Sequence, residues 1–174
     1  YQIAGVGIVA DCMPIIGENR AIVKIALESI KKHPVKGISA LLNVAGVSIE
    51  DMTAKTIGFN IGPRLNAAGR MDSAYDALHL FLNSSDSVQD IAKRLDLLNT
   101  ERRAMTEIFT EEAKAMVDPN APLVIVSSAN WNPGINGLVA SRLVDYTTKP
   151  VMVLSEQQEV YVASCRSIPS FGMV

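Results

Sequence analysis

Residues 87–117 read SVQDIAKRLDLLNTERRAMTEIFTEEAKAMV and contain neither glycine nor proline. Charged residues of both signs along this stretch are typical of a solvated helix surface with intrahelical ion pairs. At about 1.5 Å per residue, such a helix would extend ~45 Å, more than one compact domain of this size needs. We therefore expect it to bridge two lobes. Its apolar residues recur three, four or seven positions apart, as one helical face requires: Ile91, Leu95, Leu98, Met105, Ile108 and Ala113.

The composition is that of a folded protein. The chain has 174 residues, 48% of them hydrophobic, with 16 Lys and Arg against 18 Asp and Glu. These values allow a core in one or two domains and exclude intrinsic disorder. No apolar run reaches the roughly 18 residues of a membrane span, and the N-terminus lacks a signal-peptide pattern, so we expect a soluble, cytoplasmic protein. A net charge of −2 argues against coating of nucleic acid by bulk attraction, but not against phosphate binding by a few arginines.

Before the long helix, the sequence predicts one buried strand and several short helices. The apolar run IAGVGIVA at 3–10 is interpreted as a strand that ends in a polar loop at Asp11. The Gly62–Pro63 pair is interpreted as a turn. Capping residues, apolar spacing and breakers predict helices at 18–32, 38–44, 53–59 and 73–82.

After the long helix, two prolines at 118–122 mark a linker. Apolar runs then predict strands at 123–128, 151–155 and 160–165, with a helix at 134–144. We therefore expect an α/β protein that comprises the end of a helix-rich lobe (1–86), a long connecting helix (87–117) and the start of a second α/β lobe (118–174). An apolar run directly at Tyr1, and a second lobe too short for a covered sheet, indicate a piece of a longer protein at both ends.

Asp11 is the candidate metal ligand. A carboxylate at the carboxyl end of a strand could hold a hard divalent cation, although an Asp that caps the next turn has the same pattern. A two-metal site needs several Asp and His ligands around ions ~3.5–4 Å apart. Neither His33, before a proline, nor His79, between leucines, has ligand-like spacing. Cys12 and Cys165 have no CxxC spacing and are interpreted as thiols.

The segment GPRLNAAGR at 62–70 combines two arginines, an asparagine and small residues in an expected turn before a helix. Guanidinium groups match phosphate oxygens in pairs, and small side chains allow close approach of the backbone, so this loop is a candidate phosphate contact. A packing turn in which Arg64 and Arg70 pair with Asp72 and Asp76 is the alternative. The spacing does not separate the two.

Two further candidates lie in the second lobe. Trp131 is more typical of a packing anchor than of a base-stacking platform, and the helix that begins after it presents backbone donors that could meet an anion. Ser164 and Arg166 lie two positions apart on an expected strand, so both point to one face and could bind one phosphate. An exposed strand edge explains the same pattern.

Four sequence blocks follow one another along the chain: GIVADCMPIIGENR (7–20), IGFNIGPRLNAAGRMD (57–72), WNPGINGLVASRL (131–143) and ASCRSIP (163–169). In content and order they resemble the RecJ family of bacterial single-stranded-DNA exonucleases, which belongs to the DHH phosphoesterases. The resemblance covers essentially the whole chain, and the second block is specific by itself.

This resemblance implies a 5′→3′ exonuclease that hydrolyses single-stranded DNA in repair and recombination. Two Mn²⁺ or Mg²⁺ ions would activate water in a cleft between a DHH lobe and a DHH-associated lobe. The implied partners are single-stranded DNA with a 5′ end and, for the longer enzyme, a helicase or single-strand-binding protein, with no membrane.

The resemblance also implies roles for individual residues. Asp11 would be the last of the metal-binding aspartates, and therefore catalytic. The second block would line the nucleic-acid channel through Arg64, Asn66 and Arg70. The fourth block would bind the terminal phosphate through Ser164 and Arg166.

Two features depart from the family pattern. Asn132 stands where the family usually has histidine, and the family's AspHisHis and GlyGlyHis motifs have no counterpart in these 174 residues. With one ligand out of a cluster, the chain by itself is expected neither to bind the two metal ions nor to hydrolyse DNA. Two other functions fit the pattern: a DHH phosphoesterase that acts on short oligonucleotides or small phosphate esters, and a noncatalytic nucleic-acid-binding module on the same scaffold.

Overall fold

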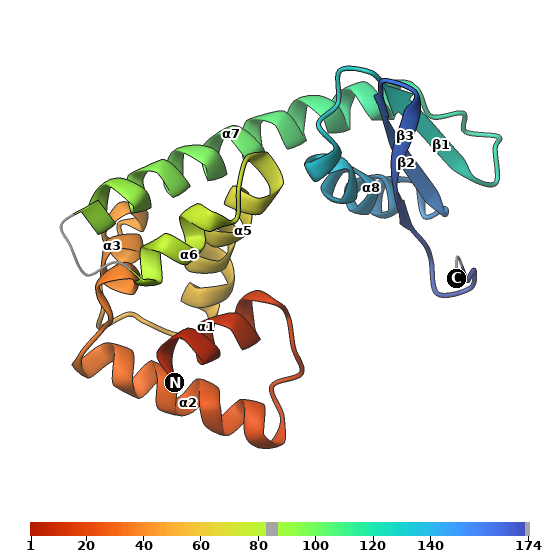
Figure 1. Cartoon of the computed structure of the whole chain (residues 1–174). Coiled ribbons are helices and arrows are strands. Elements are labelled where there is room, and N and C mark those ends of the chain that lie inside the picture. Colours follow the sequence, from red (N-terminus) through yellow and green to blue (C-terminus); the bar gives the residue numbers. More distant parts are fainter. Residues whose placement is uncertain (83–86, 173–174) are drawn as a thin grey trace. The chain divides into compact units, whose positions relative to one another are not determined.

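The computed structural model describes residues 1–82 and 87–172 (Figure 1). The chain divides into two compact units, Tyr1–Thr100 and Glu101–Val174. Helix α7, Ser87–Ala115, contributes its first part to one unit and its second part to the other. The long helix expected at 87–117 is therefore present and ends two residues earlier than predicted. None of the helices in the described part of the chain is both long and apolar enough to cross a lipid bilayer.

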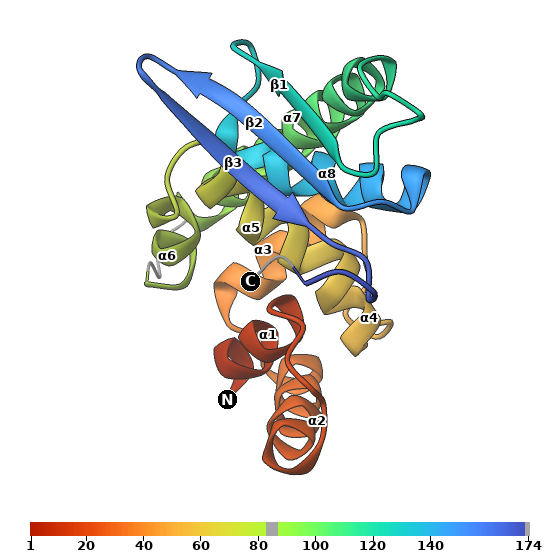
Figure 2. The same ribbon diagram turned by 90° about the vertical axis from the view of Figure 1, so that its right-hand side faces the viewer.

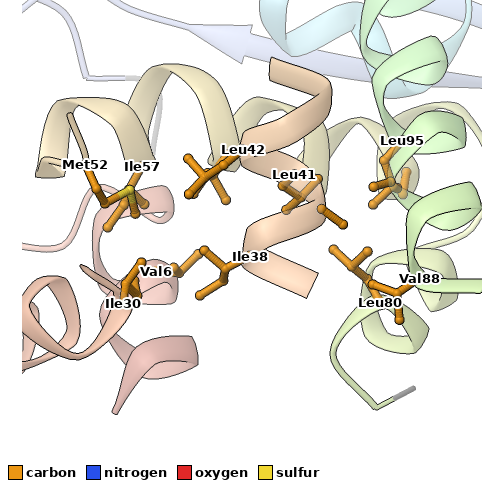
Figure 3. Packing of buried hydrophobic residues seen from close by; sticks show 14 residues of the cluster. Val6, Ile30, Ile38, Leu41, Leu42, Met52, Ile57, Leu80, Val88 and Leu95 are labelled. Atoms are coloured by element: carbon orange, nitrogen blue, oxygen red, sulfur yellow. The ribbon is translucent and has the colours of Figure 1, made fainter. Parts of the chain in front are cut away.

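The described part of the first unit consists of helices. In its hydrophobic core, the side chains of Ile38 and Leu41 from α3 pack with those of Ile30, Leu80 and Leu95 (Figure 3). These five residues are fully buried, which ties α2, α6 and the start of α7 to α3. The elements are α1 Gln2–Ala10, α2 Gly17–Lys32, α3 Lys36–Ala45, α4 Ala54–Thr56, the π-helical turn η1 Ile57–Ile61, α5 Gly62–Met71, α6 Tyr75–Leu82 and the first part of α7.

The strand predicted at 3–10 is wrong, because these residues form helix α1. A short apolar run fits a buried strand or a buried helix equally well, and the partner decides between them. Here the partner is α2: a Cβ on Gly5 would lie only 2.3 Å from Cβ of Ala26, so the two helices touch at this glycine. The helical period places Gln2 and Val6 together in the interior, whereas Ile3 is half exposed.

Gln2 fixes the start of α1 by three hydrogen bonds. Its side-chain amide donates to Oγ of Ser29 and to the carbonyl of His33, both at 2.8 Å, and its Oε1 accepts from the backbone N–H of Val35 at 2.9 Å. These bonds satisfy backbone groups where α2 ends. A strand at this position could not place Gln2 and Gly5 on the same packing surface.

The turn predicted at Gly62–Pro63 is also wrong, since the chain stays helical from α4 through η1 into α5. Thr53 is the N-cap of α4 and forms a reciprocal capping box with Thr56. Pro63 is the second residue of α5 and follows the π-helical turn directly, so the continuous helix lacks one backbone N–H donor at this point. The segment 62–70 is therefore a helix and not a loop.

The second unit has the predicted order of strand, helix, strand and strand. The elements are β1 Val124–Ser128, α8 Pro133–Thr147, β2 Val151–Gln157 and β3 Val160–Arg166. The strands lie side by side in the order β1-β2-β3, with β1 parallel and β3 antiparallel to β2, and α8 covers one face (Figure 2). The buried residues of β1 and β2 alternate, in agreement with one covered face.

Trp131 is a packing anchor, as predicted. Its side chain is buried, and its ring centroid lies 6.1 Å from that of Phe109. Its indole N–H donates to Oε2 of Glu112 at 2.7 Å. This one residue therefore ties the loop before α8 to the second part of α7.

Two glycines in α1 test the helical packing. Gly5→Ala should destabilise the chain by about 1–3 kcal/mol, because the added methyl group overlaps Ala26. Gly7→Ala should stabilise it by about 0.5–1 kcal/mol, because a Cβ there meets no atom within 4 Å and alanine favours the helix. Urea denaturation followed by circular dichroism measures both. In a strand, positions 5 and 7 would share a face, so equal effects would contradict the helix.

Candidate functional site

The predicted metal ligand Asp11 and the predicted DNA contact Asn66 line one hollow of about 230 Å³ in the first unit. Asp11 is the C-cap of α1, and Asn66 lies on the exposed side of α5. The remaining lining is mostly apolar: Ile3, Val6, Gly7, Ala10, Leu65 and Phe81. The fold thus places two polar residues, 55 positions apart in sequence, in the lining of one mostly apolar hollow.

The carboxylate of Asp11 is exposed and makes no hydrogen bond or ion pair with the residues that the structure describes. Its backbone N–H donates to the carbonyl of Gly7 at 2.9 Å, and Cys12 follows in a left-handed conformation with φ of 54°. The turn is therefore formed by the backbone. The alternative in which the Asp11 side chain caps the turn has no support in the geometry.

The residues described do not amount to a metal centre. No group of three or more His, Cys, Asp or Glu side chains lies close enough together to hold an ion anywhere in 1–82 and 87–172. Asp11 offers carboxylate oxygens, which are suitable ligands for a hard divalent cation. One carboxylate does not hold two ions, so these residues alone do not fit a two-metal site.

Arg64 is engaged within the first unit. Its Nε and Nη2 both lie 2.8 Å from Oδ1 of Asp96 on α7, and its Nη1 donates to the carbonyl of Asn60 at 2.7 Å. The side chain is 13% exposed. Asp96, and not Asp72 or Asp76, is therefore its partner; both of those carboxylates pair with Arg94, at 2.6 and 2.9 Å. Arg64 joins the π-helical turn to α7.

Arg70 lies in the last turn of α5 and is half-buried. Its side chain is not without an interaction partner. Arg70 lies on the same helix as Asn66, four residues further along. Residues four apart lie on one helical face, so the two side chains are neighbours on the surface of α5. Of the two arginines in the segment 62–70, Arg70 is the one nearer to the end of the helix.

In the second unit, Ser164 and Arg166 point to the same face of β3, as their spacing predicts. Both lie over α8 at Gly137: a Cβ on this glycine would be 3.7 Å from Oγ of Ser164 and 3.2 Å from Nη2 of Arg166. The guanidinium is exposed and donates from Nη1 to the carbonyl of Cys165 at 2.7 Å. Nε and Nη2 make no hydrogen bond with the described residues, so both can donate to an anion.

Asn132 is the N-cap of α8, and its Oδ1 accepts from the N–H of Gly134 at 2.9 Å. Asparagine is among the best N-cap residues, and the proline that follows suits the first helical position. The position was singled out in the sequence only as a departure from histidine. The Asn-Pro pair before an apolar helix is the signal that identifies the cap.

The comparisons with known proteins agree on one family, although no family model matches the chain. The single-stranded-DNA-specific exonuclease RecJ of Bacillus subtilis is 37% identical over 178 residues, which cover 99% of this chain. A crystal structure of exonuclease RecJ bound to manganese matches 99% of the chain with a TM-score of 0.86 and 30% identity. The chain belongs to the RecJ family.

RecJ of Thermus thermophilus in complex with Mg²⁺ gives a TM-score of 0.85 at 31% identity over 96% of this chain. The chain covers 23% of the Bacillus subtilis RecJ, and 43% and 26% of the two solved RecJ chains. The α/β fold class and the family inferred from the four sequence blocks are confirmed. The chain corresponds to about a quarter of the length of the curated RecJ relative.

The contacts of Arg64 predict a structural role that can be measured. Arg64→Ala should lower the free energy of unfolding by about 1–3 kcal/mol, because it leaves the half-buried Asp96 carboxylate and the Asn60 carbonyl without their donor. Arg94→Ala, which breaks the pairs of a more exposed guanidinium with Asp72 and Asp76, should cost about 1 kcal/mol or less. Urea denaturation of both variants checks the order, and an equal or reversed order would show that Arg64 does not hold the turn.

Proposed function

We propose that this chain is a segment of a metal-dependent exonuclease that hydrolyses single-stranded DNA from its 5′ end, in repair and recombination. The supporting observation is the match to RecJ in sequence and fold over 99% of the chain. The relatives are named single-stranded-DNA-specific exonucleases, and the solved structures are named with manganese or Mg²⁺. The substrate and the divalent cation of the longer enzyme are inferred from these.

In the proposed organisation, metal binding and recognition of the strand end belong to different parts of the chain. Residues 1–86 belong to the DHH lobe, 87–117 to the connecting helix and 118–174 to the DHH-associated lobe. The first part contributes Asp11 as one ligand of the metal ions and lines the DNA channel. The third part binds the end of the strand. The proposed location is the cytoplasm, and a helicase or single-strand-binding protein would supply the strand.

Within the first lobe, the exposed carboxylate of Asp11 is free of competing bonds to described residues, and so is available to a cation. The metal, once bound with ligands from outside these 174 residues, would supply an activated water. Asn66 at the same hollow and Arg70 on the same helix would contact the nucleic acid beside it. For Arg64, the bonds to Asp96 and Asn60 favour support of this surface over direct contact with phosphate.

Within the second lobe, the half-buried Ser164 and the exposed Arg166 present a hydroxyl and a guanidinium on the face of β3 that lies over α8 at Gly137. A terminal phosphate carries more negative charge than an internal phosphodiester and accepts more charge-assisted hydrogen bonds. Recognition of the 5′ end by this pair would therefore determine the polarity of digestion, independently of the metal ions.

The first test of this function concerns the metal ligand. In the longer enzyme, Asp11→Asn should abolish most Mn²⁺- or Mg²⁺-dependent digestion of a 5′-labelled single strand while leaving the melting temperature unchanged, because the side chain has no structural partner among the described residues. The isolated 174-residue chain should show no such activity. A matched loss of melting temperature would make Asp11 a structural residue, and digestion by the isolated chain that Asp11→Asn abolishes would contradict the incomplete metal site.

The second test concerns the end of the strand. Arg166→Ala in the longer enzyme should slow digestion of 5′-phosphorylated strands about tenfold to a hundredfold, the value of one or two charge-assisted hydrogen bonds. Strands with a 5′-hydroxyl should be digested at a nearly unchanged rate. Arg142→Ala, in which another exposed arginine of the same unit loses its pair with Glu107, is the control. Equal losses on the two substrates would show a general backbone contact instead of end recognition.

A further inference from the structure

Gly137 lies in the interior of α8, the fifth residue of a helix that covers Pro133–Thr147. A glycine in such a position destabilises a helix by about 0.5–1 kcal/mol relative to alanine. The space around it gives a reason. Apart from its chain neighbours and the backbone of α8 itself, the three atoms nearest to a Cβ added at this position are Nη2 and Cζ of Arg166 and Oγ of Ser164. The missing side chain leaves room for these two residues.

The neighbouring Asn136 fixes the distance between α8 and the sheet. It is buried, its Nδ2 donates to the carbonyl of Val162 at 3.0 Å, and its Oδ1 accepts from Oγ of the buried Ser155 at 2.8 Å. Val162 lies on the same face of β3 as Ser164, two residues away. The part-buried bond to Val162 holds β3 against α8, and the buried bond to Ser155 holds β2. The two strands therefore cannot move away from α8 to make room for a larger residue at 137 without breaking these bonds.

A Cβ at position 137 would therefore act on the guanidinium of Arg166. The distance of 3.2 Å from Nη2 is shorter than an ordinary carbon contact, whereas Oγ of Ser164, at 3.7 Å, is within the ordinary range. Arg166 is exposed and its guanidinium is the end of a flexible side chain, so it would turn away instead of displacing the backbone. Its hydrogen-bond donors would then no longer face the same position as the Ser164 hydroxyl.

We propose that Gly137 is a positioning residue for recognition of the terminal phosphate: the absence of its side chain holds Arg166 beside Ser164 over α8, at a separation set by Asn136. This rests on the proposed function, because the ligand of the pair is the 5′-phosphate of a DNA strand. Gly137 does not contact the ligand. It acts through the direction of one guanidinium.

The test uses the longer enzyme with two single strands that differ only in a 5′-phosphate or a 5′-hydroxyl. The preference for the phosphorylated strand should fall a few-fold in Gly137→Ala and about tenfold in Gly137→Leu, the value of roughly one charge-assisted hydrogen bond. The preference is a ratio of two rates on one preparation, so partial unfolding does not change it. The melting temperature of Gly137→Ala should not fall, because alanine favours the helix.

A double-mutant cycle shows whether Gly137 acts through Arg166. In the Arg166→Ala background, Gly137→Leu should cause no further loss of preference, because the group that it displaces is absent. The control is Ser141→Ala, which removes a hydrogen bond of 3.0 Å to the carbonyl of Gly137 but adds no atom near Arg166, and should keep the preference.

The outcomes separate this proposal from the proposed function. An unmodified enzyme without any preference for 5′-phosphorylated strands would overturn end recognition itself. A clear preference in the unmodified enzyme that survives Gly137→Leu, or losses that add in the double variant, would overturn the role of Gly137 alone.

Discussion

Helix α7 is the constraint on which both units depend, because each builds part of its core against it. In the first unit, Val88, Ala92 and Leu95 of α7 are buried in the cluster formed with α3 and α6. In the second, Glu112 accepts the hydrogen bond of Trp131. This uninterrupted helix of 29 residues therefore has to supply buried side chains to two separate units with a single helical period.

The second part of α7 meets this requirement with buried polar residues. Thr106 and Thr110 are both buried, and each hydroxyl donates to a carbonyl one turn earlier in the same helix, at 2.7 and 2.6 Å. Such bonds satisfy a hydroxyl within its own helix, so threonine can replace an apolar residue in an interior without a partner from another element. The apolar pattern that predicts α7 therefore leaves out these two interior positions.

The parts of the fold that follow from local periodicity could be predicted from the sequence, and those that depend on a distant partner could not. The long helix and the alternation that places Ser164 beside Arg166 are local. Residues 3–10 form a helix because of Ala26, which meets Gly5, and nothing within the apolar run indicates that contact. The Gly62–Pro63 pair is helical because the preceding π-helical turn continues into it.

The same distinction applies to the candidate site. That Asp11 and Asn66 share a hollow follows from the packing of α1 near α5, across 55 positions of sequence. The partner of Arg64 is Asp96, which lies 32 residues away on α7. The sequence suggested Asp72 and Asp76 as partners because these are the acidic residues nearest along the chain. Gly137 was missed because a lone glycine in a helix has no chemical function of its own, and its role becomes visible only when β3 is placed against α8.

The asparagine at position 132 affects how the second unit responds to acidity. A histidine, which the family usually has there, changes charge between about pH 5 and 8, and a positive charge at a helix N-terminus opposes the helix dipole. The amide of Asn132 neither gains nor loses a proton in that range, and its bond to the N–H of Gly134 requires only the carbonyl oxygen. The start of α8 in this protein therefore keeps the same charge and the same cap in mildly acidic and mildly alkaline surroundings.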